Sequence, residues 1–148
     1  MSQSLSQMWI HIIFSTKNRK PFLTNLEIRK QLHDYLFALC DQYSCPALIV
    51  GGVEDHVHLL ISLHKSLSLS SIIEKIKKYS SKWIKSSVPE FYWQSGYGAF
   101  SVSKTNIEKV KSYIQNQQEH HRKINFQDEL RKILDSSGIK YDEKYVWG

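Results

Sequence analysis

Hydrophobic residues along the chain form four short runs with the composition of β-strands. The segment Met8–Thr16 is rich in β-branched and aromatic residues, which favour extended backbone. Two further runs, Ala47–Val53 and Val57–Leu63, are joined across Glu54–Asp55, and this spacing predicts a hairpin. We expect a fourth strand over Gly96–Ser103.

Helical periodicity follows the first strand and the hairpin. Apolar residues recur at helical spacing from Leu26 to Gln42, and Asn25 is the expected N-cap, with Thr24 as a second candidate. A second helix is expected to start at Ser68 or Ser70 and to end near Ser87. Its predicted buried stripe is Ile72, Ile76, Tyr79 and Trp83, and its predicted outward stripe is Lys75, Lys78, Lys82 and Lys85.

The last third of the chain predicts two more helices. A long one is expected from a cap at Thr105 or Asn106 through about Lys123. A short one is expected over Phe126–Ser136, with Gly138 ending it.

The order of these elements predicts the fold class. Strand, helix, strand, strand, helix, strand is typical of an α+β protein with a ferredoxin-like split βαβ sandwich. In such a fold an antiparallel sheet carries helices on one face, and here C-terminal helices are added. The chain has no repeat, low-complexity tract or linker rich in proline and glycine, so we expect residues 1–148 to form a single domain.

Composition favours a globular protein with reduced cysteines and a polyanionic partner. With 148 residues, 41% of them hydrophobic, the chain can bury a core without disulfide staples. The two cysteines, Cys40 and Cys45, are expected to be reduced thiols in a cytoplasmic protein. The apolar run Met8–Phe14 is interrupted by His11 and is too short to span a bilayer. A net charge of +6 favours a polyanionic partner.

Two histidines on one predicted strand are the first candidate site. His56 and His58 flank Val57, and because strand side chains alternate between faces, both imidazoles point the same way. Two neutral imidazoles can bind one divalent metal ion. The alternative is a chance pair of hydrogen-bonded strand histidines.

Three polar residues on the predicted third helix are the second candidate site. Tyr113, Gln117 and His121 are spaced by four residues and share one polar stripe, with His120 adjacent. An amide oxygen of Gln117 can add a metal ligand to His56 and His58, leaving positions open for a phosphate oxygen. Tyr113 would then attack that phosphate and form a covalent phosphotyrosine. The alternative is an amphipathic tyrosine that covers the sheet edge.

Basic and aromatic residues supply candidate nucleic-acid contacts. Tyr92, Trp93, Tyr97 and Phe100 could stack on unpaired bases, although most of them could equally belong to the core. The candidate phosphate contacts are Lys17, Arg19, Lys20, Lys75, Lys78, Lys82, Lys85, Lys104, Lys109 and Arg122. The alternative is that the lysines form solvated helix faces.

Several segments together resemble single-tyrosine HUH transposases of the insertion-sequence 200/605 type. They are Glu54–Leu63 (EDHVHLLISL), Trp93–Ser103 (WQSGYGAFSVS) and Lys109–Lys123 (KVKSYIQNQQEHHRK). The opening Ile12–Leu23 also fits. The closing pattern from Phe126 onward is similar to the subgroup of REP-associated tyrosine transposases.

The resemblance implies a DNA transposase with a defined site. The family's metal-binding histidines correspond to His56 and His58, its nucleophile to Tyr113, and its third metal ligand to Gln117. It further implies Mg²⁺ or Mn²⁺ as cofactor, single-stranded DNA with hairpins as substrate, a 5′-phosphotyrosine intermediate and a homodimer. It leaves His120 and His121 with a phosphate contact, a helix cap or catalysis as alternatives.

Two other classes of histidine enzyme require histidines at particular positions. A histidine-triad nucleotide hydrolase needs a histidine at position 60, where this chain has Leu60. A two-histidine phosphodiesterase needs a second His-x-Ser/Thr motif on another strand, and the segments that start at His11 and His33 do not supply one. The remaining alternative is a dimer that binds hairpin DNA or RNA without cutting it.

Overall fold

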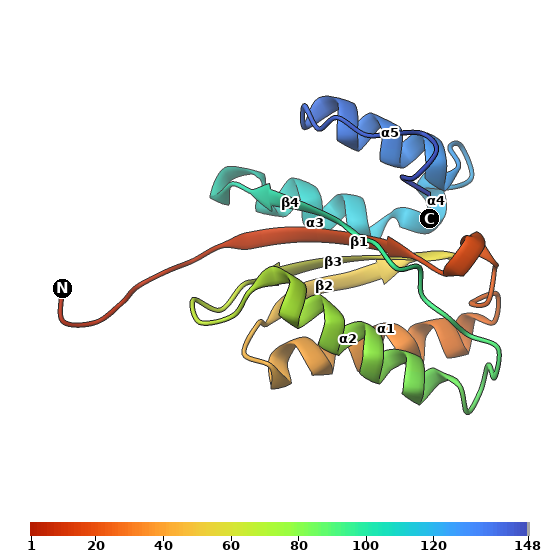
Figure 1. Cartoon of the computed structure of the whole chain (residues 1–148), viewed down its shortest axis with the longest axis horizontal. Coiled ribbons are helices and arrows are strands. Elements are labelled where there is room, and N and C mark those ends of the chain that lie inside the picture. Colours follow the sequence, from red (N-terminus) through yellow and green to blue (C-terminus); the bar gives the residue numbers. More distant parts are fainter. Residues whose placement is uncertain (148) are drawn as a thin grey trace.

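A four-stranded antiparallel sheet forms the centre of the computed structural model, which describes residues 1–147. The strands lie in the order β2-β3-β1-β4. Their bounds are β1 Trp9–Ser15, β2 Ala47–Gly52, β3 His56–Ser62 and β4 Gly98–Val102. Helix α1 (Leu26–Gln42) joins β1 to β2, and α2 (Leu69–Ile84) joins β3 to β4 (Figure 1). The predicted ferredoxin-like split βαβ class is therefore confirmed.

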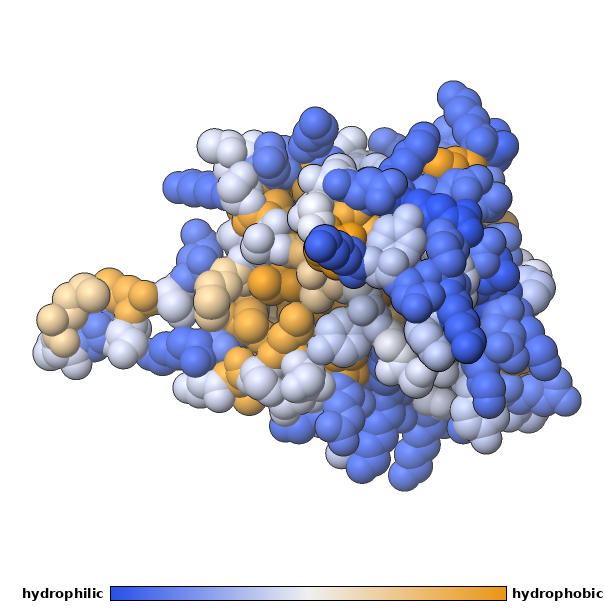
Figure 2. Space-filling model, turned by 45° about the horizontal axis from the view of Figure 1, so that its top comes forward, coloured by the Kyte–Doolittle hydropathy of each residue, from blue (hydrophilic) through white to orange (hydrophobic). Residues whose placement is uncertain are grey.

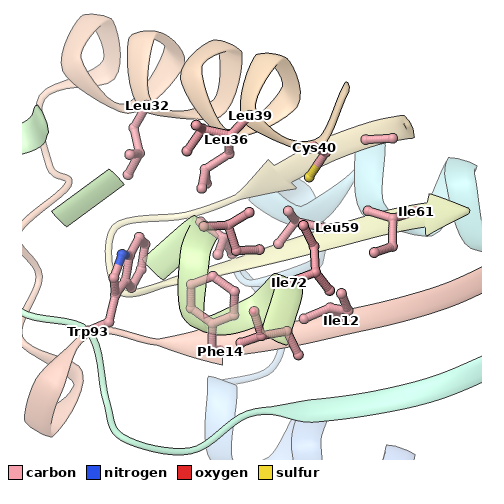
Figure 3. Close-up of a cluster of buried hydrophobic side chains, with 14 of the residues drawn as sticks. Ile12, Phe14, Leu32, Leu36, Leu39, Cys40, Leu59, Ile61, Ile72 and Trp93 are labelled. Atoms are coloured by element: carbon pink, nitrogen blue, oxygen red, sulfur yellow. The ribbon is translucent and has the colours of Figure 1, made fainter. Parts of the chain in front are cut away.

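Helices α1 and α2 cover one face of the sheet and enclose the main hydrophobic core (Figures 1 and 3). On β3 the alternate residues Val57, Leu59 and Ile61 point into this core, and each is fully buried. Cys40 and Cys45 lie in the same core as free thiols. The core therefore takes one full face of the strand that bears the histidines.

Side-chain caps fix the starts of α1 and α2 where the sequence predicted them. The side-chain oxygen of Asn25 accepts a hydrogen bond from the backbone N–H of Ile28 at 3.1 Å. The hydroxyl of Ser68 accepts one from the backbone N–H of Ser71 at 3.2 Å. Of the two predicted starts of α2, the structure therefore selects the Ser68 cap.

The buried stripe predicted for α2 is wrong at its C-terminal half. Tyr79 and Trp83 are 37% and 36% exposed, and their rings stack on Tyr43, which follows α1, and on Tyr35 of α1. The residues that α2 buries are Ile72, Ile73, Ile76, Ser80 and Ile84.

The opposite face of the sheet is covered by shorter helices from the last third of the chain (Figure 1). They are η2 (Lys104–Asn106), α3 (Ile107–Gln115), α4 (Gln117–His120) and α5 (Phe126–Ser136). The single long helix predicted through Lys123 is wrong, because Asn116 leaves helical geometry at φ −99° and ψ 21°. Asparagine favours such breaks. Asn106 is the N-cap of α3, as predicted, but its side chain makes no capping bond.

Two glycines of β2 allow close approaches beside the histidine strand. A Cβ atom at Gly51 would stand 2.6 Å from the carbonyl oxygen of Ile114, so only glycine lets α3 pack this closely on β2. Gly52 has φ +157°, and a Cβ atom there would collide with the carbonyl oxygen of His56. A larger residue at either position would force the neighbouring backbone to move.

Helix α5 packs through a second apolar cluster on the sheet face that α1 and α2 leave free. Phe126, Leu130 and Leu134 contact Ile13 of β1. The helix keeps its predicted bounds and ends before Gly138, whose φ of +67° suits the left-handed conformation that terminates helices.

The basic turn after β1 is docked beside the histidine strand. This turn, η1 (Lys17–Arg19), contains two non-glycine residues with positive φ, Asn18 and Arg19. Just before it, the backbone N–H of Thr16 donates to the carbonyl oxygen of Asp55 at 2.8 Å, and its hydroxyl donates to the carbonyl oxygen of Lys20 at 2.7 Å. The turn is therefore fixed next to the start of β3.

The face of the molecule drawn in Figure 2 carries many hydrophilic side chains. Figure 2 shows hydrophobic side chains gathered beside the base of the projecting N-terminal segment. Within residues 1–147 no helix is both long enough and apolar enough to span a membrane.

Candidate active site

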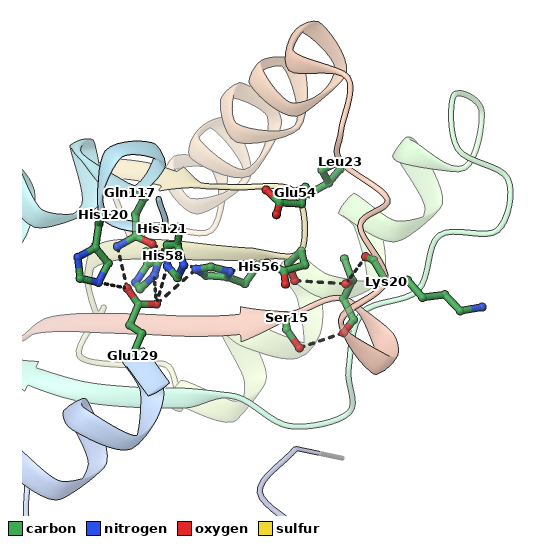
Figure 4. Close-up of polar contacts among 12 residues, drawn as sticks. Ser15, Lys20, Leu23, Glu54, His56, His58, Gln117, His120, His121 and Glu129 are labelled. Carbon is green, nitrogen blue, oxygen red and sulfur yellow. Dashed lines mark hydrogen bonds and ion pairs between the residues drawn. The ribbon is translucent and has the colours of Figure 1, made fainter. Parts of the chain in front are cut away.

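Strand β3 presents His56 and His58 on the face opposite the main core. Val57 between them is buried in that core, so the predicted alternation holds. Both imidazoles are fully buried, and they point towards α4 and α5 (Figure 4). The sheet therefore delivers two imidazoles to one enclosed polar site.

His56 is held by partners on both ring nitrogens. Its Nδ1 lies 2.7 Å from Asp55 Oδ1, and its Nε2 lies 3.2 Å from Gln117 Oε1 and 3.4 Å from Glu129 Oε1. Burial opposes protonation of this imidazole, but the hydrogen bonds to Asp55 and Glu129 outweigh it and raise the pKa of His56 to about 9. At neutral pH both nitrogens of His56 therefore carry protons and donate.

His58 is held in the same way by a histidine from β1. Its Nδ1 lies 2.9 Å from His11 Nε2, and its Nε2 lies 3.2 Å from Glu129 Oε1. Burial lowers the pKa of His58 to about 4 and that of His11 to about 3, so both rings are neutral at pH 7. Because the carboxylate can only accept, His58 donates to it from Nε2 and accepts from His11 at Nδ1.

Tyr113 of α3 points its hydroxyl into the same site. The hydroxyl donates to Glu129 Oε2, and it lies 3.4 Å from Nε2 of His120. Burial and the adjacent Glu129 carboxylate raise the pKa of Tyr113 well above its usual value. The phenol is therefore protonated in this arrangement.

Gln117, the first residue of α4, joins the tyrosine helix to the histidine strand. Its side chain is buried, with Oε1 accepting from His56 at 3.2 Å and Nε2 donating to Glu129 Oε2 at 3.1 Å. The structure therefore brings together all four residues expected from the sequence, His56, His58, Tyr113 and Gln117.

Glu129 of α5 stands at the centre of the site, and sequence reasoning missed it. Its Oε1 faces the imidazoles of the histidine strand, whereas its Oε2 faces Tyr113 and Gln117. Burial opposes the negative charge, but the imidazoles of His121, His56 and His58 outweigh it and lower the pKa of Glu129 far below its usual value. Its carboxyl is therefore ionised although only 2% of the residue is exposed.

The two histidines that had no firm role also reach this carboxylate. His120 Nε2 lies 3.2 Å from Glu129 Oε2, and His121 Nε2 lies 3.1 Å from Glu129 Oε1. His64, in contrast, lies outside the site and accepts a hydrogen bond from the backbone N–H of Ser66.

The donor set fits a divalent metal ion. The ligand atoms of His56, His58, His121 and Glu129 all lie within 4.8 Å of one another. The Nδ1 atoms of His56 and His58 are each engaged by a second partner, which is the usual arrangement around metal-binding histidines. Within the described residues, Nε2 of His121 is buried without a hydrogen-bond partner. Such an unpartnered nitrogen beside the Nε2 atoms of His56 and His58 is suited to a metal.

The ten basic residues predicted to contact DNA do not form one surface. All are exposed or half-buried. Four of them, Lys75, Lys78, Lys82 and Lys85, belong to the α2 segment on the far face of the sheet. Lys109, however, lines a cavity of about 390 Å³ beside Tyr113, together with Lys123 and His120. Tyr92 and Tyr97 are exposed at 55% and 42%, whereas Trp93 is buried.

Comparison with known families decides the identity. The family model described as Transposase IS200 like matches residues 4–117, a range that includes both strand histidines, Tyr113 and Gln117. This chain belongs to the IS200-like transposase family. It is therefore a transposase, an enzyme of DNA transposition.

Relatives of this IS200-like transposase span most of its length. The transposase for insertion sequence element IS200 of Salmonella typhimurium is 27% identical over 120 residues, covering 76% of this chain and 78% of the relative. The ISDra2 transposase TnpA of Deinococcus radiodurans is 24% identical, with coverage of 75% and 84%.

Two solved structures share the fold of this IS200-like transposase. A transposase structure from Deinococcus radiodurans has a TM-score of 0.63 at 23% identity, covering 77% of this chain and 93% of the other. A REP-associated tyrosine transposase bound to a REP hairpin has a TM-score of 0.60 at 15% identity, covering 82% and 74%. The family match ends at Gln117, so His120, His121 and Glu129 lie beyond the matched residues.

Proposed function

We propose that this IS200-like transposase cuts and rejoins single-stranded DNA at hairpin-bearing ends, with Tyr113 as nucleophile in a metal-dependent HUH endonuclease site. The main support for this proposal is that the Tyr113 hydroxyl and the Nε2 atoms of His56 and His58 all lie next to the buried carboxylate of Glu129. A nucleophile and a metal-binding pair are thus adjacent without a partner chain.

The side chains of the site have separate roles in the proposed reaction. His56, His58 and Gln117 would hold Mg²⁺ or Mn²⁺, which supplies charge stabilisation on the transferring phosphate. Asp55 and His11 orient the two imidazoles through their Nδ1 atoms. Burial of the imidazoles excludes water from their Nε2 atoms.

Tyr113 performs the covalent step. Its hydroxyl oxygen forms a bond to phosphorus while the bond from phosphorus to the 3′-oxygen breaks, which gives a 5′-phosphotyrosine and a 3′-hydroxyl end. The phenol must lose its proton, and Glu129 Oε2 and His120 Nε2 are the acceptors within reach, while the leaving 3′-oxygen takes up one proton to become the hydroxyl. The linkage keeps the energy of the broken phosphodiester, so a 3′-hydroxyl can reverse the step without ATP.

The DNA partner fits the charge around the nucleophile. Lys109 and Lys123 line the cavity beside Tyr113, where they can pair with phosphates next to the one attacked. The solved relative that binds a REP hairpin supports a hairpin substrate for this chain as well.

We also propose a homodimer. Strand β4 is an edge of the sheet, and hydrophobic side chains gather near the N-terminal segment, so association there would cover both a free strand edge and apolar surface (Figure 2). Light scattering on the purified chain would test this, and a monomer at micromolar concentration would contradict it.

The proposed chemistry is tested by trapping the covalent intermediate. Purified protein is incubated with labelled single-stranded DNA that carries the hairpin ends of its element, with Mn²⁺, with Mg²⁺ or with a chelator. We expect a protein–DNA adduct on a denaturing gel only when a metal is present.

A matched pair of tyrosine variants completes this experiment. Tyr113→Phe removes the nucleophilic oxygen and should abolish the adduct while hairpin binding is retained, whereas the exposed Tyr145→Phe should form it normally. Hairpin binding with no adduct under any condition would instead favour a non-catalytic hairpin-binding protein.

A further inference from the structure

We propose that helix α5 and the end of α4 complete the metal centre, with Glu129 of α5 and His121, which follows α4, as further ligands of the ion held by His56 and His58. This inference rests on the proposed function, because it concerns the same site. It adds two ligands from residues beyond the range that the family model matches.

The spacing of the ligand atoms carries the inference. Glu129 Oε1 lies 3.4 Å from Nε2 of His56, 3.2 Å from Nε2 of His58 and 3.1 Å from Nε2 of His121. Two ligands that each bind one ion at about 2.1 Å stand roughly 3.0–3.4 Å apart at coordination angles near 90–110°. The three separations fall in that range.

The state of His121 points the same way. Its Nε2 is buried and, among the described residues, unpaired, although the carboxylate oxygen is only 3.1 Å away. A buried ring nitrogen without a hydrogen bond is costly unless a metal ion binds it. The nitrogen faces the point at which His56 and His58 also converge.

The two oxygens of Glu129 have separate surroundings. Oε1 faces the three imidazoles of the proposed centre, whereas Oε2 accepts from the Tyr113 hydroxyl and from the amide of Gln117. A carboxylate in this position can bind the ion through one oxygen and orient the nucleophile through the other. An anionic ligand also offsets the charge of a divalent ion in a buried site.

Metal binding by the full chain tests the proposal independently of DNA cleavage. Calorimetric titration of the metal-free protein with Mn²⁺ gives the affinity of the wild type and of Glu129→Gln, His121→Gln and His58→Ala. Asp128→Asn is the matched control, because it removes one carboxylate from the exposed side of the same helix. We expect Glu129→Gln and His121→Gln to weaken binding roughly 10- to 100-fold, and Asp128→Asn to leave it unchanged.

A spectroscopic count of ligands keeps the test valid if a variant folds poorly. Spin-echo measurements on bound Mn²⁺ detect coordinating imidazole nitrogens, and we expect three in the wild type and two in His121→Gln. Glu129→Asp, which retains the charge on a shorter side chain, should also weaken binding.

The outcomes separate this inference from the proposed function. If His58→Ala abolishes Mn²⁺ binding while Glu129→Gln binds as tightly as the wild type, the carboxylate only occupies the place that the ion takes, and the inference is overturned. Two imidazole nitrogens in the wild type would likewise overturn the role of His121. If the wild type binds no Mn²⁺, the proposed function itself fails.

Discussion

The two faces of the sheet differ sharply although they are built from the same strands. On β3, the core face presents Val57 and Leu59 to α1 and α2, while the other face presents His56 and His58 to α4 and α5. The first face is filled with hydrocarbon. The second places imidazole, amide and carboxylate groups around the two histidines, and most of these groups hydrogen-bond to one another.

The apolar face therefore mainly stabilises the fold, whereas the polar face mainly serves the function. An apolar side chain is stabilised by burial against any well-packed neighbour, whereas each buried imidazole here needs specific partners on other elements. His58 requires His11 from β1 and Glu129 from α5, and His56 requires Asp55 and Gln117. The polar face therefore depends on the correct docking of all the helices that cover it.

Substitutions on adjacent positions of β3 should have opposite consequences. Leu59→Ala removes a fully buried core side chain and should lower the free energy of unfolding by about 2–5 kcal/mol, with adduct formation retained in the folded fraction. His58→Ala should lower adduct formation at least about 100-fold through loss of a metal ligand. It should lower stability by about 1–3 kcal/mol, because His11 and Glu129 lose a partner.

Urea denaturation and the adduct gel measure the two quantities on the same preparations. Ile61→Val serves as a mild control for the core face, since it removes one methylene from a buried side chain. Loss of adduct in Leu59→Ala protein that is still folded would show that the two faces are not independent.

The polar face should also make stability depend on pH when no metal is bound. The pKa of His56 is about 9 in the folded protein and about 6.5 in the unfolded chain. The contribution of protonated His56 to the free energy of unfolding is thus complete below pH 6.5 and is lost as the pH rises to 9. The folded pKa values of His58 and His11, about 4 and about 3, lie below the value of the unfolded chain. Protonation of these two histidines therefore favours the unfolded chain, and stability should rise with pH up to about 6.5.

Urea midpoints measured with a chelator at pH 5, 6.5 and 8 test this maximum. One proton corresponds to about 1.4 kcal/mol per pH unit, so His56 alone would remove about 2 kcal/mol between pH 6.5 and 8. His56→Gln should flatten only that upper limb. A wild-type chain whose stability does not fall above pH 6.5 would contradict the raised pKa of His56.

Local patterns predicted the apolar face well. The apolar strand composition gave the four strands, and the capping side chains of Asn25 and Ser68 marked the helix starts. The two mistakes in helix α2, Tyr79 and Trp83, are amphipathic rings that stack on neighbouring tyrosines at the surface. The break at Asn116 was missed because periodicity continues through a single non-helical residue.

The polar face was predictable only where its residues share one element. Spacing on a strand gave His56 and His58, and spacing on a helix gave Tyr113 and Gln117. Glu129 could not be found in this way, since its position on α5 carries no signal until α5 is docked on the sheet. His11 had a usable signal, because it alternates with the core residue Ile12 on a strand.

The smallest effect expected concerns lysines on the two sides of the molecule. Lys109 lines the cavity beside Tyr113, whereas Lys82 is exposed on α2 on the far face. Lys109→Ala should weaken binding of single-stranded DNA several-fold and reduce the slope of log affinity against log salt by about 0.7, the value for one phosphate contact. Lys82→Ala has the same change of charge and should alter neither quantity. Fluorescence anisotropy with a labelled hairpin at several salt concentrations measures both. An equal loss in the two variants would mean that the strand also crosses α2, and the separation of a structural face from a DNA-binding face would then be wrong.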